Sequence, residues 1–88
     1  MKVLVETEDS EGMDSLAGKN VLLLCANYFY AGKLTGINTE CVKLENAGIV
    51  YDTGGWDGEK FSNFQKLPPF PVYIQKDSIE SFTETDKL

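Results

Sequence analysis

The sequence contains neither histidine nor arginine, and its eight basic residues are all lysines. Without histidine, no His-based triad, histidine metal site or imidazole general base can form. Without arginine, the chain lacks the bidentate guanidinium contacts that recognise phosphate or guanine. Three carboxylates flank a glycine-rich stretch, and because nothing fixes their geometry we interpret them as a solvated hairpin tip: Asp52, Asp57 and Glu59. We therefore expect no enzyme, no metal site and no cofactor.

Cysteine and long apolar runs are also scarce. The two cysteines, Cys25 and Cys41, lie in apolar segments and form no metal-type cluster, so both are interpreted as small buried hydrophobic residues. No apolar run reaches the roughly 18 residues of a membrane span, and the N-terminus lacks the apolar core of a signal peptide. These features predict a reduced, cytoplasmic protein with no membrane partner.

Charge of both signs is present, but it is unevenly distributed over the 88 residues. Of the net charge of −6, segment 1–17 carries −4 and segment 77–88 carries −3, whereas 18–76 carries +1. We interpret the acidic ends as solubilising segments, with repulsion of nucleic acid from part of the surface as the alternative. A chain of this length forms one domain. Small domains bury a modest share of their surface, so self-association is expected to add stability.

Residues 18–82 are predicted to form an all-β domain between an acidic N-terminal segment (1–17) and an acidic C-terminal tail (83–88). Stretch 21–26 has apolar residues at both odd and even positions, which point to opposite faces of a strand, so both faces of that strand should be covered. Gly32 and Gly36 interrupt the next stretch and predict a sharply bent strand. Further strands are expected at 41–51, 72–76 and 79–82. The result is a small five-stranded, strongly bent antiparallel barrel, with at most a short N-terminal helical turn and an inserted loop at 53–71.

Two groups of aromatic residues each leave two interpretations open. Tyr28, Phe29 and Tyr30 follow the apolar run and are interpreted as core residues, with a stacking platform for single-stranded nucleic acid as the alternative. Aromatic residues of the inserted loop are interpreted as packing that loop onto the barrel, with an aromatic binding face as the alternative. These are Trp56, Phe61, Phe64 and Phe70.

Three motifs in this order resemble those of the Sm/LSm family, including its Hfq branch. Gly18-Lys19-Asn20-Val21 is similar to the family's Gly-Lys-x-Val, and Tyr30-Ala31-Gly32-Lys33-Leu34 to its Tyr-x-Gly-x-Leu. Segment 72–79 follows the shape of Val-Phe-Ile-Arg-Gly-x-x-Ile. The resemblance implies an SH3-like Sm barrel that binds single-stranded RNA, or alternatively DNA, as an RNA chaperone or a nucleic-acid processing accessory.

The sequence departs from this family at the residues that would bind RNA. Glu40 stands where the family has a stacking aromatic or histidine, and a carboxylate has no stacking face and repels phosphate. The remaining candidates are Asn38 and Gln75 for base edges, Lys76 for a phosphate and Lys33 for peripheral electrostatics.

The resemblance also implies a homo-oligomeric ring, expected to hold five to seven subunits, in which the fourth strand of one subunit pairs with the fifth strand of the next. The apolar segments 72–74 and 79–82 would otherwise be exposed edges, which soluble proteins avoid. The predicted interface residues are Val72, Tyr73, Ile74, Ile79 and Phe82. The alternative function is a ring-shaped structural or adaptor protein that binds a protein partner.

Overall fold

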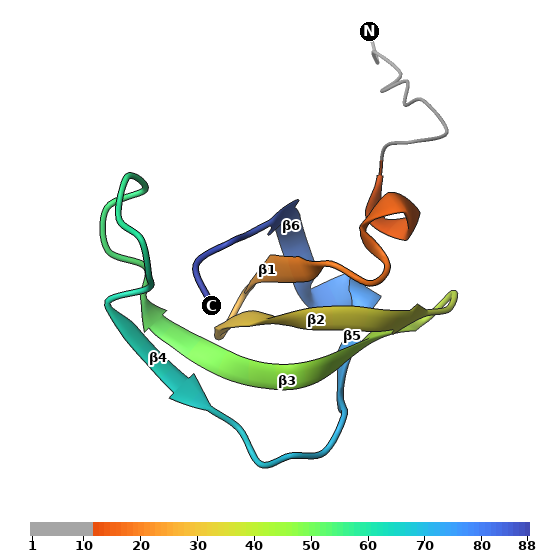
Figure 1. The fold of residues 1–88 in the computed structure, drawn as a ribbon. Coiled ribbons are helices and arrows are strands. Elements are labelled where there is room, and N and C mark those ends of the chain that lie inside the picture. The colour runs from red at the N-terminus through yellow and green to blue at the C-terminus, as the bar shows by residue number, and fades with distance from the viewer. Residues whose placement is uncertain (1–11) are drawn as a thin grey trace, which may run out of the picture.

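The computed structural model describes residues 12–88, which form one antiparallel sheet with two short 3-10 turns (Figure 1). The elements are η1 (Met13–Leu16), β1 (Asn20–Cys25), β2 (Phe29–Ile37), β3 (Cys41–Asp52), β4 (Asn63–Lys66), β5 (Val72–Gln75), η2 (Lys76–Ser78) and β6 (Ile79–Glu84). The all-β prediction is confirmed. The acidic N-terminal segment lies mostly outside the described residues. In the described part of the chain, no helix is long and apolar enough to cross a membrane.

The sheet runs in the order β4-β3-β2-β1-β6, and β5 pairs with β3 along the same side as β4. β4 covers the C-terminal half of β3, from Gly48 to Asp52, whereas β5 covers its first residues, Cys41 to Leu44. Among the pairings that the described residues make, none joins β5 to β6. Among the described strands, the bent sheet therefore has free edges along β4 and β5, which both pair with β3, and along β6 at its other end.

The predicted bend in β2 is present at both glycines. The pairing of β2 with β3 shifts register between Ala31 and Lys33 and again between Leu34 and Gly36. At the first shift, a Cβ on Gly32 would lie 2.9 Å from the Cα of Ala47, closer than packed atoms allow. Asn46 on β3 takes a positive φ of 52°, a conformation that asparagine tolerates better than most residues. A missing side chain on one strand and a left-handed residue on the other thus produce the bend.

β1 is buried on both faces, as predicted from its apolar residues at both odd and even positions. Val21, Leu23 and Cys25 face the interior of the barrel, where they pack with Leu34, Val42, Leu44, Ala47 and Ile74. Leu22 and Leu24 face the other side and pack with Ala31, Val50 and Phe61. A strand in the middle of two layers contributes its whole apolar surface to stability, at roughly 25 cal/mol per Å² buried.

The outer layer comes from the inserted segment and the C-terminus. Phe61 is buried and Phe64 half-buried against β1 and β3, so these two aromatic residues pack the insertion onto the barrel. Part of the insertion forms β4, a sixth strand where the sequence predicts a loop. The opposing Gly48 makes this possible, because a Cβ there would overlap the Phe64 ring. The prolines follow β4 at 68–71, which agrees with an edge position.

Residues 83–88 also belong to this layer. Lys87 is only 8% exposed, and its Nζ donates hydrogen bonds to the carbonyl oxygens of Gly55 (3.0 Å) and Trp56 (2.7 Å). The same ammonium lies 5.2 Å from the centre of the Trp56 ring, and Leu88 packs against the outer core. The first residues of the predicted acidic tail thus belong to strand β6, and Lys87 near its end binds the inserted segment.

The expectation that Tyr28 and Phe29 are core residues is wrong. Tyr28 is 48% exposed and Phe29 also reaches solvent, whereas Tyr30 packs against the inner core as expected. The reason is the position of the turn between β1 and β2. Tyr28 lies in that turn and Phe29 at the very start of β2, where no further layer of the described chain covers them.

Candidate nucleic-acid interface

The turn between β2 and β3 lies against the end of β5. Cys41 is opposite Gln75 in the β3–β5 pair, and the backbone N–H of Lys76 donates to the carbonyl oxygen of Glu40 at 2.8 Å. Within the turn, the backbone N–H of Asn38 donates to the carbonyl oxygen of Cys41 at 3.0 Å. The structure therefore brings together Asn38, Gln75 and Lys76, three predicted nucleic-acid residues from two distant parts of the sequence.

Asn38 is a structural residue of this turn. Its side-chain Oδ1 accepts hydrogen bonds from the backbone N–H groups of Glu40 and Cys41, both at 2.8 Å. A short polar side chain that bonds the backbone two or three residues on is a frequent device for closing such turns. Because the oxygen holds the turn, only the amide NH2 group of Asn38 remains to meet a base.

An exposed aromatic side chain lies beside this turn. Tyr73 is 62% exposed, and it stands opposite Lys43 just as Gln75 stands opposite Cys41. Alternate residues of a strand point to the same face, so these four side chains share the outer face of the sheet, while Ile74 and Val42 between them point into the core.

A shallow groove of about 230 Å³ runs along this outer face. It is lined by Gly36, Ile37, Asn38, Cys41, Lys43 and Tyr73. Tyr73 is not among the binding residues predicted from the sequence, where it is assigned only to the subunit interface. A signal was available in the alternation of segment 72–75, because placing Ile74 in the core turns Tyr73 and Gln75 outward.

Charges of both signs surround the groove. The Nζ of Lys43 lies 4.0 Å from the carboxylate of Glu45, a solvent-exposed pair, and Glu40 and Asp77 flank Lys76. An exposed ion pair of this kind contributes little to stability, so Lys43 can exchange Glu45 for a phosphate. With so little excess positive charge, a nucleic acid at this groove would need stacking and hydrogen bonds as well as contacts to lysines.

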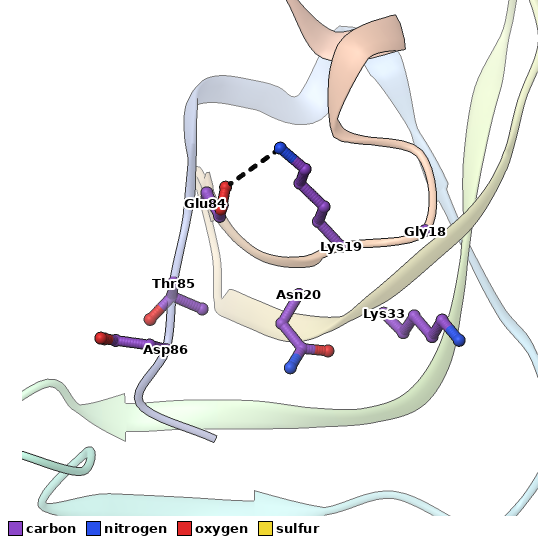
Figure 2. Close-up of a pocket in the computed structure, with 7 residues that line it drawn as sticks. All are labelled: Gly18, Lys19, Asn20, Lys33, Glu84, Thr85 and Asp86. Atoms are coloured by element: carbon purple, nitrogen blue, oxygen red, sulfur yellow. Dashed lines mark ion pairs between the residues drawn. The ribbon is translucent and has the colours of Figure 1, made fainter.

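Lys33 lies apart from the other three predicted residues. It stands opposite Asn20 in the β1–β2 pair and lines an open pocket of about 560 Å³, with Lys19 and two carboxylates, Glu84 and Asp86 (Figure 2). The Lys19 ammonium is 3.6 Å from Glu84, whereas Figure 2 shows the Lys33 side chain pointing away from that pair. Two lysines and two carboxylates leave the pocket without a net charge that would favour an anion.

The predicted interface residues divide by strand parity. Tyr73 and Phe82 expose much of their side chains, Val72 and Ile79 are half-buried, and Ile74 is buried in the inner core. Ile74 can therefore reach a neighbouring subunit only through its backbone. Both strands that carry these residues present an edge that no other described strand covers.

Comparison with known proteins shows the fold. No protein-family model matches the chain, and no curated protein matches its sequence. The structure is similar to that of the Sm protein of Pyrococcus abyssii, solved in complex with a uridine heptamer, with a TM-score of 0.56 and 19% sequence identity. The match covers 82% of this chain and 90% of that protein. The chain thus has an Sm-like fold, and the resemblance read from its motifs agrees with the structure.

Proposed function

We propose that this protein binds single-stranded RNA as a homo-oligomeric ring of Sm-like subunits, acting as a chaperone or processing accessory. The observation that carries the proposal is the meeting of the Asn38 turn with Gln75 and Lys76 beside the exposed ring of Tyr73. The similarity to an Sm protein that was solved with a uridine heptamer supports RNA as the ligand class.

The polar and aromatic side chains in the groove and beside it each have a role that their chemistry allows. The Tyr73 ring stacks on a base, an interaction that contributes about 1–3 kcal/mol per base in single-strand binding proteins. Lys43 and Lys76 meet phosphates, and the amide of Gln75 offers a donor and an acceptor to a base edge. This arrangement replaces a stacking residue at position 40, where Glu40 has no ring, by one on the neighbouring strand.

Ring assembly would make these weak contacts sufficient. The free edges of β5 and β6 lie on different parts of the subunit, so pairing one edge with the other is head-to-tail, and such pairing closes into a ring when the rotation allows. A ring repeats the groove around its axis, and a strand of RNA that spans several grooves binds far more tightly than it binds one.

The test is a titration of fluorescent oligo(U), oligo(A) and oligo(dT) by anisotropy at two salt concentrations. We expect Lys76→Ala to weaken RNA binding and to lower the slope of log K against log salt by about 0.7 for each phosphate that is no longer neutralised. Tyr73→Ala should weaken binding without changing that slope. Lys66→Ala removes the same charge from exposed strand β4 and is the matched control.

A second candidate function rests on two aromatic side chains of the insertion. Trp56 is 66% and Phe70 72% exposed, which fits a structural or adaptor protein that holds a protein partner. The titration separates the two functions. Absence of RNA binding at low salt, or equal weakening in Lys76→Ala and Lys66→Ala, would overturn the RNA proposal and favour the adaptor.

A further inference from the structure

The start of β2 and the end of β3 lie together, at the opposite end of these two strands from the Asn38 turn (Figure 1). Exposed aromatic side chains occur there at Tyr28, Phe29 and Tyr51. Phe29 is opposite Val50 in the β2–β3 pair, so the flanking residues Tyr28 and Tyr51 are brought side by side. Together with the turn 25–27 they border a cleft of about 290 Å³, which we call the tyrosine cleft. Tyr51 is 53% exposed, and the cleft lies apart from the proposed RNA groove.

The rings of the tyrosine cleft are set at steep angles to one another. Those of Tyr28 and Tyr51 are 6.5 Å apart between centroids at an interplanar angle of 89°. Tyr30, which does not line the cleft, packs against Tyr28 at 6.2 Å between centroids and 69°. Two parallel rings would hold a flat nucleobase between them. Walls that are nearly perpendicular instead fit a compact, rounded group, and a cation near aromatic faces is attracted by the ring quadrupole.

The charges nearest the tyrosine cleft along its strands are negative. The residues that line it are all uncharged, and so is the whole of segment 20–32. Asp52 directly follows Tyr51, and its Oδ1 accepts a hydrogen bond from the N–H of Gly54 at 2.9 Å, which fixes the carboxylate. On the other side, Cys25 is paired with Ile79, which Glu80 follows. This distribution attracts a cation and repels a phosphate backbone.

We propose that the tyrosine cleft binds a lysine side chain of a partner protein, either free or methylated. Its ammonium group would contact the rings of Tyr28 and Tyr51, with Asp52 compensating the charge, and its apolar stem would lie along Phe29. The cleft volume of about 290 Å³ lies at the lower end of the range typical of small-molecule pockets, about 300–1,000 Å³. A cleft of this size suits one side chain better than a larger ligand.

The test uses three capped pentapeptides that differ only in the central residue, which is lysine, trimethyllysine or acetyllysine. Each is titrated into the full chain while the ring signals of Tyr28 and Tyr51 are followed by NMR. We expect the two cationic peptides to shift these signals, and the neutral acetyllysine peptide to bind at least about fivefold more weakly, because it offers no cation to the rings or to the nearby carboxylate. Binding of the cationic peptides should weaken as salt rises.

Three variants sharpen the test. Tyr51→Ala should weaken the cationic peptides at least about threefold. Asp52→Asn keeps an acceptor for Gly54 but removes the charge, so it should weaken them and reduce the salt dependence. Tyr73→Ala removes another exposed tyrosine, one that lies in the RNA groove, and should leave peptide binding unchanged, which separates this proposal from the RNA proposal.

Three outcomes would overturn the proposal. The first is equal binding of the acetyllysine peptide, which would show an apolar contact without charge recognition. The second is the absence of any shift at millimolar peptide. The third is a shift of Tyr28 and Tyr51 by oligo(A) in place of the peptides, which would make the cleft a nucleobase site.

Discussion

At the scale of single residues, the alternation of side chains along a strand decides which of them reach solvent and can contact a ligand. Tyr73 and Ile74 are adjacent, yet one is exposed on the outer face and the other is buried in the inner core. The same rule turns Gln75 outward beside Tyr73. Asn38 shows a different effect, because the turn it closes already uses its side-chain oxygen.

Two residues at the inner core are expected to make the stability of the fold fall at alkaline pH. Burial raises the pKa of the Cys25 thiol above its ordinary value of 9.0, and Glu80 adds to this shift. Burial also raises the pKa of the Tyr30 hydroxyl above 10.0. The folded state therefore holds both protons more tightly than the unfolded state does. The resulting stability is complete below the unfolded-state values and is lost as pH rises through the folded-state values.

We expect the Tm to stay nearly constant around pH 7 and to fall progressively above about pH 8, where an unfolded thiol begins to ionise. Thermal unfolding measured in steps from about pH 7 to 10.5 tests this. Cys25→Ala should lower the Tm at every pH but flatten part of the alkaline fall. Cys41→Ala, which changes a cysteine on the outer face, should leave the fall unchanged. A wild-type Tm that is constant over the whole range would contradict the argument.

At the scale of elements, the insertion and the C-terminus stabilise each other. Residues 53–62 have one large buried anchor, Phe61, and the chain end supplies a second through Lys87, which is bonded to two carbonyl groups of the insertion. Another bond runs the other way, from the Lys60 ammonium to the carbonyl oxygen of Leu88 at 3.2 Å.

Lys87→Met keeps most of the aliphatic stem but removes the ammonium, leaving the carbonyl groups of Gly55 and Trp56 without their donor. Because hydrogen bonds to charged groups contribute about 1.5–3 kcal/mol, we expect a clear loss of stability in urea unfolding. Hydrogen exchange should rise in 54–62 and stay unchanged in β1 to β3. Lys60→Met, at an exposed position, should have a much smaller effect. If the two variants lose the same stability, Lys87 does not hold the inserted segment in place, and the argument is contradicted.

At the scale of the whole molecule, the open sheet needs a partner for its edges. Neither β5 nor β6 is covered along its outer edge by another described strand, and Phe82 on β6 is exposed. Unpaired strand edges are a liability for a soluble protein. Pairing β5 of one copy with β6 of the next would satisfy these two edges at once, and a closed ring would repeat that pairing at every subunit.

Light scattering on a sizing column should therefore show a discrete oligomer across micromolar concentrations. Phe82→Glu places a charge at the proposed interface and should shift the protein toward the monomer. Thr83→Glu adds the same charge at the next residue of β6, on the opposite face, and should leave the oligomer intact. A wild-type chain that is strictly monomeric would rule out the ring.

The local parts of the fold could be predicted from the sequence. Apolar parity located β1 and its burial on both faces, and Gly32 and Gly36 located the bends of β2, because burial pattern and glycine freedom are properties of short segments. The absence of histidine and arginine excluded whole classes of site on chemical grounds alone.

The tertiary structure decided which residues that are distant in the sequence become neighbours. It set Tyr73 beside Lys43, brought Tyr28 to Tyr51, moved Lys33 away from the other predicted residues, and placed Lys87 beside Trp56. It also made a strand from 63–66, because Gly48 leaves room for Phe64. Such neighbours depend on strand register, and a shift of one residue turns every side chain to the other face. The missing histidine and arginine limited the chemistry of this protein, and register decided where its remaining lysines and tyrosines meet.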